Sequence, residues 1–432
     1  MNRRILKLAI PNIISNISVP LLSAVDTAVV GHLNHVYFLG AIAVGSMIFN
    51  FLYWGFGFLR MGTTGLTAQA FGEDDQEQSI HILSRSLLVA LAGSILLLLL
   101  QGLIADASFY IVHSTPDVEN YARSYFFIRI YAAPATLALY AFNGWFLGMQ
   151  NARYPMIVTV AINGLNVILD ILFVFHFGLK SDGVAWGTLV SAYVGLILCI
   201  IFFTYRYLSF VHFLKWFKVF ELEAIKKFFT VNRDIFIRTL CLIFTYSFFT
   251  VKSAGYGEDI LAANTILLQL WNIMSYGVDG FAYAAESLVG RFKGAKDTGN
   301  FQAAIRYTII WGVGLGVVFS IGYAVFGREL VSLFTKDASL INLAMGFFVW
   351  TAIAPLINSF SFMLDGIFIG ATATAAMRNS MIIATVIIFL PVYYITYPSF
   401  GYQAIWLAMI TYMVARALAL AFYMKRRIYA WF

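Results

Sequence analysis

Long apolar stretches dominate the chain, and short polar segments separate them. A helix needs about 20 mainly apolar residues to cross the hydrocarbon core of a bilayer. Windows of that kind recur along the sequence and predict twelve spans, at residues 9–31, 39–66, 84–105, 123–148, 155–177, 184–206, 235–254, 260–288, 305–326, 342–370, 379–398 and 402–424. The pattern therefore predicts an all-α polytopic membrane protein.

An internal repeat divides the chain into two halves. At an offset of 222 residues, Gly55 matches Gly277, Leu66 Leu288, Gly72 Gly294, Asp75 Asp297, Gly144 Gly366, Phe146 Phe368 and Gly148 Gly370. Each half holds an even number of predicted spans, so both enter the membrane in the same direction. This predicts two six-helix lobes related by a pseudo-twofold axis along the membrane normal. The lobes are residues 1–206 and 235–432, and a basic, amphipathic cytoplasmic linker at 207–234 joins them.

Composition supports a membrane location, with the lipid bilayer as the main partner. Only 11% of residues are charged and 61% are hydrophobic, whereas a soluble domain carries about 25% charged residues. The net charge of +7 does not indicate nucleic acid binding, because the positive residues form short clusters between apolar runs.

The distribution of lysine and arginine predicts the orientation. With the N-terminus in the cytoplasm, 20 of them fall in cytoplasmic segments, Arg238 included, and 6 fall in outer segments, Arg129 included. We expect a plasma (inner) membrane protein with both termini cytoplasmic.

No motif of enzyme catalysis is present: the chain lacks GxSxG, HExxH and a phosphate-binding GxxxxGK[ST] loop. Cys199 and Cys241 lie in apolar stretches without neighbouring metal ligands. We therefore expect neither an enzyme nor a cofactor or required metal. Uphill transport would then draw on an ion gradient.

Polar residues inside the spans are the first candidates for a functional site, because burying them in hydrocarbon is costly. Asn163, Asn166 and Asp170 share one helix face. Span one carries a second polar stripe that ends at Asp26, and Asn143 and Thr188 add oxygens in neighbouring spans. Together they predict a polar chamber in the first half.

Two kinds of chemistry fit such a chamber. A buried carboxylate takes up a proton near neutral pH, which proton coupling requires. Sodium instead needs several oxygen ligands, and Asp26, Asn166, Asp170 and Thr188 would supply them. The structural alternative is that the two aspartates only tie helices together.

Five further charged residues inside the predicted spans are also candidates for a role. Asp279 and Asp365 are either structural partners of Arg60 or Arg416 or charges of a C-lobe site or substrate cavity. Arg60 fits a salt bridge better than a clamp for an anionic substrate. Glu286 lies near the inner end of span eight, where a cytoplasmic gate or a helix end would use it.

Several stretches together resemble the multidrug and toxic compound extrusion (MATE) family. Residues 25–33 resemble its first-helix signature, 146–155 its loop between spans four and five, and 163–170 its fifth-helix motif. Residues 279–286 and 365–372 resemble the DinF-like branch. The resemblance covers essentially the whole chain.

The resemblance implies a two-lobed exporter with a central cavity that exchanges protons or sodium for organic, often cationic compounds. It assigns the N-lobe cation site to Asp26, Asn166 and Asp170, with Asn143 and Thr188 as neighbours. The sodium-coupled NorM-like branch uses an acidic residue in span seven, whereas residues 235–254 contain no Asp or Glu. This departure favours N-lobe coupling by protons.

We therefore expect a monomeric, proton-coupled multidrug efflux antiporter for small organic, drug-like substrates, with alternating access of its two lobes. The alternatives are a sodium-coupled drug antiporter and a lipid-linked oligosaccharide flippase of the same superfamily.

Overall fold

A computed structural model describes residues 1–31, 35–112 and 114–429, and in these ranges it consists of helices and contains no strand. The predicted all-α fold is confirmed. Two residues of the stretch 25–33 that carried the family resemblance, His32 and Leu33, lie outside the described residues.

The chain forms two compact units, described separately below. The N-terminal unit is Ile14–Phe228, and the C-terminal unit is Met1–Ile13 with Phe229–Phe432. Helix α1 (Asn2–Gly31) contributes residues to both units. The division falls within helix α11 (Leu222–Gly255), inside the predicted linker.

The other elements of the N-terminal unit are helices of very different lengths. They are α2 (Val36–Gly55), α3 (Phe58–Gly72), α4 (Gln76–Leu99), α5 (Gln101–Ile111), α6 (Pro116–Arg129), η1 (Ile130–Ala132), α7 (Ala133–Gly148), α8 (Arg153–Ile171), η2 (Leu172–His176), α9 (Lys180–Tyr207), η3 (Leu208–Phe213) and α10 (Trp216–Val219). Helix α3 packs on α7, α8 on α9 and α2 on α6.

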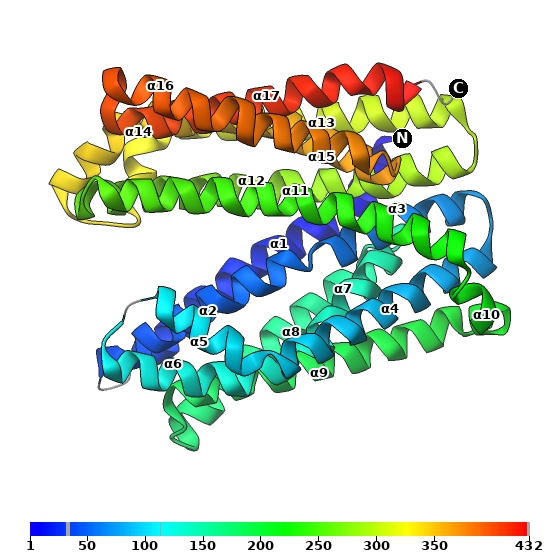
Figure 1. Cartoon of the computed structure of the whole chain (residues 1–432), viewed down its shortest axis with the longest axis horizontal. Coiled ribbons are helices and arrows are strands. Elements are labelled where there is room, and N and C mark those ends of the chain that lie inside the picture. Colours follow the sequence, from blue (N-terminus) through cyan, green and yellow to red (C-terminus); the bar gives the residue numbers. More distant parts are fainter. Residues whose placement is uncertain (32–34, 113, 430–432) are drawn as a thin grey trace. The chain divides into compact units, whose positions relative to one another are not determined.

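The C-terminal unit has longer helices, which lie alongside one another in Figure 1. They are α12 (Glu258–Gly294), α13 (Thr298–Ser332), α14 (Ala338–Gly370), α15 (Thr374–Ile382), η4 (Ile383–Phe389), α16 (Leu390–Phe400), η5 (Gly401–Gln403) and α17 (Ala404–Arg427). Helix α14 lies at the centre of this unit and packs against α12, α13 and α17.

All twelve predicted spans fall on helices. In the described residues, 10 stretches are long and apolar enough to cross a membrane. One of them, Thr374–Arg427, holds both of the last two predicted spans, separated by the tight turn at Gly401, whose φ is +54°. The remaining predicted span, 260–288, lies on α12, which also carries several charged residues.

The outward faces of the helices are apolar, as a bilayer requires. On α13, Val318, Ile321 and Val325 recur at helical spacing and are 65%, 60% and 63% exposed. A soluble protein would bury such a stripe, so we assign it to lipid contact. The chain is a polytopic membrane protein.

The repeat found in the sequence is visible in the way the helices approach each other. A side chain at Gly144 would strike the carbonyl of Arg60, and one at Gly366 would strike the carbonyl of Ala282. Both partners are also 222 residues apart. Only glycine allows two helix backbones to come so close. The matched glycines therefore show that both units pack this pair of helices in the same way.

The turns repeat as well. Asp74 and Lys296 have left-handed φ values of 56° and 53°, and Gln150 and Thr372 have 61° and 52°. The next helix begins in both units with an aspartate cap, because Asp75 accepts a hydrogen bond from the backbone N–H of Gln78 and Asp297 from that of Asn300. The duplication therefore extends to individual backbone angles.

Candidate functional site

The aspartate of the fifth predicted span is fully buried in the N-terminal unit. Asp170 lies near the end of α8 and is 0% exposed, and Asn166, one helical turn earlier, is 1% exposed. The Asn166 side-chain amide donates a hydrogen bond of 3.1 Å to Asp170 Oδ1. The other oxygen, Asp170 Oδ2, receives no hydrogen bond from the described residues.

The fold brings a second carboxyl to this one. Asp26 of α1 lies within hydrogen-bonding reach of Asp170, although the two are far apart in the sequence. Its Oδ1 is also buried without a donor among the described residues. Two carboxyl groups bond to each other only when a proton lies between them, so the pair must be treated as one titrating unit. We refer to Asp26 and Asp170 as the aspartate pair.

Helix α9 closes over the aspartate pair with a residue that the sequence analysis did not single out. A side chain at Gly187 would collide with the carboxylate of Asp170 and would come within 3.1 Å of the Asn166 amide nitrogen. Gly187, Ser191 and Gly195 follow one another at helical spacing and form a small-residue stripe. Such a stripe is typical of close helix packing. It can be read from the sequence and would have indicated this contact.

The other predicted site residues have different partners. The Thr188 hydroxyl donates to the carbonyl of Val184 in its own helix at 3.0 Å. Asn163 donates to the Ser18 hydroxyl of α1 at 2.8 Å. Asn143 Oδ1 is buried without a donor among the described residues. The structure thus joins Asp26, Asn166 and Asp170, and the roles of Asn143, Asn163 and Thr188 stay predictions.

The guanidinium of Arg129 lies near the aspartate pair. Arg129 was counted with the outer segments, although it falls within the predicted span 123–148. Arg129 ends helix α6 and interacts electrostatically with both members of the aspartate pair. It donates to the hydroxyls of Ser46 at 3.1 Å and Tyr125 at 2.5 Å. Its guanidinium carbon lies 4.9 Å from the centre of the Phe49 ring. A partly buried cation therefore balances part of the pair's negative charge.

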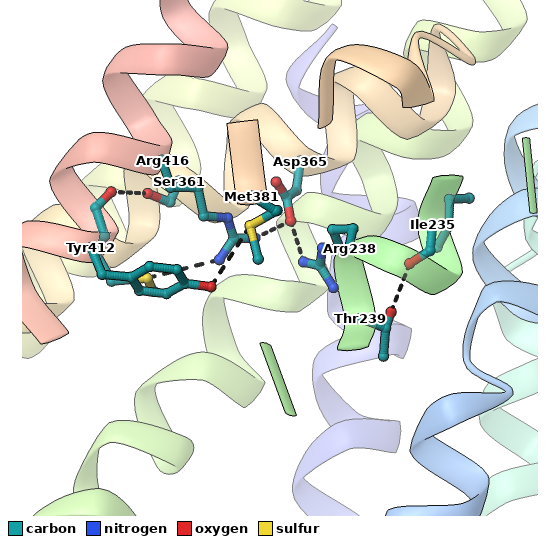
Figure 2. Close-up of polar contacts among 9 residues, drawn as sticks. Ile235, Arg238, Thr239, Ser361, Asp365, Met381, Tyr412 and Arg416 are labelled. Carbon is teal, nitrogen blue, oxygen red and sulfur yellow. Dashed lines mark hydrogen bonds and ion pairs between the residues drawn. The ribbon is translucent and has the colours of Figure 1, made fainter. Parts of the chain in front are cut away.

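Figure 2 shows a buried charged cluster of the C-terminal unit, where Asp365 lies between two arginines. Arg238 of α11 and Arg416 of α17 both donate to Asp365 Oδ2 on α14. The three residues are 7%, 0% and 4% exposed, in that order. We call them the Arg–Asp–Arg cluster.

The cluster can be compared with two expectations from the sequence. Of the alternatives that the sequence left open for Asp365, the structure contains the ion pair with Arg416. Arg238, which was counted with the cytoplasmic residues, is buried against Asp365 and lies within helix α11. A lone arginine near the start of an apolar stretch looks like a flanking charge until its partner is known.

The surroundings of the cluster hold it in place. The Tyr412 hydroxyl points to the sulfur of Met381 at 3.7 Å, and Arg416 reaches the sulfur of Met413 at 3.8 Å. Ser361 of α14 donates to the backbone carbonyl of Met413 at 2.9 Å. Three helices are thereby cross-linked around buried charges that neutralise each other only in part, since two guanidiniums share one carboxylate.

Three other charged residues of the predicted spans are at least partly buried. Glu286 of α12 is 2% exposed, and Asp279 lies near Tyr246 and Tyr276. Arg60 lies near Tyr140 in the N-terminal unit. The described contacts assign none of the three a chemical role, so their proposed roles stay predictions.

Span seven begins earlier than predicted and does contain acidic residues. Helix α11 starts at Leu222 and therefore includes Asp234, which is 1% exposed. Arg378 pairs with Asp234 at 2.7 Å, and Thr374 donates to it at 3.3 Å. The predicted span 235–254 contains no acid only because it was taken to begin one residue after Asp234. The carboxylate of Asp234 is neutralised by Arg378.

Comparisons with known proteins agree with this architecture. The MatE family model matches residues 11–172 and 235–395, one stretch in each half. The chain is 36% identical to DNA damage-inducible protein F of Escherichia coli (strain K12) over 436 residues, which cover 97% of this chain and 91% of that protein. It is 22% identical to a probable multidrug resistance protein NorM of Bacillus anthracis, over 93% and 90% of the two chains.

A solved structure shows the same fold. It is described as the outward-facing conformation of a multidrug resistance MATE family transporter of the MOP superfamily. The TM-score is 0.89 at 19% sequence identity, and the alignment covers 99% of this chain and 96% of that one.

Proposed function

This chain belongs to the MatE family of membrane transporters, and from this premise we propose that it exports small organic, often cationic compounds in exchange for protons. The observation that carries the proposal is the aspartate pair. Asp26 and Asp170 lie within hydrogen-bonding reach of each other in a buried site, so that the site gains a proton when its two carboxyls meet and loses it when they part.

The proposed exchange follows from the charge of this site. With one shared proton the pair carries a single negative charge, which the nearby Arg129 balances. Loss of that proton leaves an uncompensated negative charge, and an organic cation would then compensate it. Proton and substrate compete for the same charge, and a transporter that changes conformation only when the charge is compensated exchanges the two instead of leaking either.

Several contacts support protons over sodium as the coupling ion. Sodium requires several oxygens around one point, yet Asn166 presents its amide nitrogen to Asp170. The close approach of Gly187 also leaves little room beside Asp170 for an ion. Sodium coupling through Asp26, Asn166, Asp170 and Thr188 is the alternative that the experiment below tests.

We further propose that the chain works as a monomer in the plasma (inner) membrane with both termini in the cytoplasm. The orientation is supported by the excess of lysine and arginine in the segments on that side. The C-terminal end of α17 fits this orientation, since Lys425, Arg426 and Arg427 form its last turn.

Purified protein in lipid vesicles tests the coupling ion directly. We expect a pH gradient alone to drive uptake or release of an organic cation such as ethidium, and a sodium gradient alone to drive none. Asp26→Asn and Asp170→Asn should each reduce proton-driven transport by at least tenfold. Asp182→Asn, which changes a half-buried acid of α9 that accepts from Ser124 at 2.9 Å, is the matched control and should transport normally.

Two results would contradict the proposal. Transport by the wild type under a sodium gradient but not under a pH gradient would establish the sodium alternative. Wild-type rates in both Asp26→Asn and Asp170→Asn under a pH gradient would remove the aspartate pair from the mechanism.

A further inference from the structure

One face of helix α4 holds the segment 208–221, which leads from α9 to α11. Glu77, His81 and Arg85 recur every four residues along α4 and therefore share this face. Each of the three makes a polar contact with the short helix α10 or with the residue just before it. The segment therefore has a fixed place on the N-terminal unit.

Two of the three contacts use groups that keep their charge around neutral pH. Arg85 is buried and donates to the backbone carbonyls of Lys218 at 2.6 Å and Val219 at 2.8 Å. The Glu77 carboxylate pairs with the ammonium groups of Lys215 at 3.0 Å and Lys218 at 2.6 Å. A guanidinium does not lose its proton in proteins, and two ammonium groups favour the charged form of a carboxylate. These contacts therefore persist in mild acid.

The contact of His81 is different, because it depends on a neutral ring. The ring is 4% exposed, and its Nε2 accepts a hydrogen bond of 3.1 Å from the backbone N–H of Lys215. A protonated imidazole carries N–H on both nitrogens and accepts no hydrogen bond. Histidine ordinarily changes its charge between about pH 5 and 8. Protonation of His81 would therefore replace this hydrogen bond with two N–H groups that point at each other.

Charges of both signs surround the His81 ring. At α4 these are the carboxylates of Asp75 and Glu77 and the guanidinium of Arg85, and at α10 the ammonium of Lys218. The two acids attract an imidazolium and the two bases repel it, so their effects on the ring largely offset each other. The response of this contact to pH therefore follows from the loss of a hydrogen-bond acceptor and not from an excess of one charge.

We propose that His81 is a pH-sensitive fastening of the segment 208–221: the neutral ring holds the backbone N–H of Lys215, and protonation releases it. Release would free the chain before α10, while Arg85 still holds the end of that helix. The segment leads into α11, which contributes residues to both units, as α1 does. In the proposed orientation the segment lies in the cytoplasm, so acid on that side loosens it. This inference does not depend on the coupling ion or on the transported substrate.

Hydrogen exchange of the full-length protein in lipid nanodiscs, read by mass spectrometry, tests the fastening. The quantity compared is the protection of the peptide that contains Lys215, which is the exchange rate of an unstructured peptide of the same sequence at the same pH divided by the observed rate. We expect this protection to fall roughly three- to tenfold between about pH 7.5 and about pH 5.5, as the loss of one hydrogen bond implies. Protection within α9 should not change.

Three variants assign the response to the ring. His81→Gln keeps an acceptor that does not titrate, because the side-chain carbonyl of glutamine can accept the same N–H, and its protection should be alike at the two pH values. His81→Ala has no acceptor and should show low protection at both. His212→Gln is the matched control, since His212 is an exposed histidine of the same segment whose ring lies 3.3 Å from the Ser209 carbonyl. It should respond to pH like wild type.

Three results would overturn the proposal. Equal protection of the wild-type peptide at the two pH values would mean that the His81 contact does not hold the segment in a pH-dependent way. A pH response that persists in His81→Gln would assign the response to another group. Loss of protection in α9 together with the segment would mean that acid unfolds the N-terminal unit instead of releasing the segment.

Discussion

At the scale of single residues, the geometry of the aspartate pair depends on the lack of a side chain at Gly187. Asp170 and Asn166 are packed so closely against α9 that Gly187 leaves no room for even a methyl group next to the carboxylate. In the proposed mechanism the Asp170 carboxyl meets Asp26, exchanges a proton and separates again, and this needs a fixed starting position. The backbone of α9 provides this position through the absence of a side chain.

We therefore expect Gly187→Ala to reduce proton-driven transport by at least tenfold, because the new methyl group displaces the Asp170 carboxylate. Transport in lipid vesicles at matched protein amounts measures the effect. Gly164→Ala is the matched control, since a side chain there meets nothing within 4 Å, and it should transport like wild type. Equal rates for the two variants would mean that the close approach at Gly187 has no functional role.

At the scale of helices, matching aspartate caps begin α4 and α13 in the two units. In the second unit, Asp297 accepts from the backbone N–H of Asn300 at 3.0 Å and from its side-chain amide at 2.7 Å. These hydrogen bonds from Asn300 hold the pKa of Asp297 below its usual value. The bond from the backbone N–H also satisfies one of the amide groups that the first turn of a helix leaves without a partner inside the helix.

The sign of the pH effect follows from that lowered pKa. The folded carboxyl binds its proton less readily than the unfolded one, so its stabilisation is fully present above the unfolded pKa of about 4 and is lost as the pH falls through the folded value. We expect Asp297→Ala to speed hydrogen exchange in the first turn of α13 at neutral pH. In acid below the folded pKa, the variant and wild type should exchange alike.

Asp297→Asn serves as the control for the cap, since asparagine also caps helices but does not titrate in this range. Its first turn should keep its protection in acid relative to wild type. If Asp297→Ala exchanges like wild type at neutral pH, the cap makes no contribution to the stability of that turn.

At the scale of the whole molecule, the two halves share a backbone plan but differ in their buried charges. At the offset of 222 residues, Asn166 and Asp170 correspond to Ile388 and Val392, and Asn143 corresponds to Asp365. The first half thus keeps an aspartate pair with one nearby guanidinium. The second half instead joins one aspartate to two arginines.

This difference predicts opposite phenotypes in the two halves. Asp365→Asn leaves two buried guanidiniums without a full counter-charge, and removing one partner of a buried ion pair typically costs about 3–5 kcal/mol. We expect a large drop in the thermal unfolding temperature of Asp365→Asn, whereas Asp170→Asn should unfold near the wild-type temperature and lose transport. Thermal unfolding in detergent, alongside the transport assay, measures both.

Asp337→Asn is a suitable control for the stability measurement, because Asp337 is an exposed cap at the start of α14. It should leave the unfolding temperature nearly unchanged. An Asp365→Asn variant that unfolds normally but no longer transports would show that the Arg–Asp–Arg cluster takes part in transport and is not only structural.

The sequence by itself determined the membrane location, the twelve helical spans, the duplication and the stripe of Asn163, Asn166 and Asp170, because these follow from hydropathy and spacing along one chain. Only the tertiary structure decided which polar groups meet. It joined Asp26 to Asp170, put Gly187 against them, and buried Arg238 and Arg416 on the same oxygen of Asp365. A buried charge and a flanking charge look alike in sequence, since the difference lies in partners on other helices that no local pattern records.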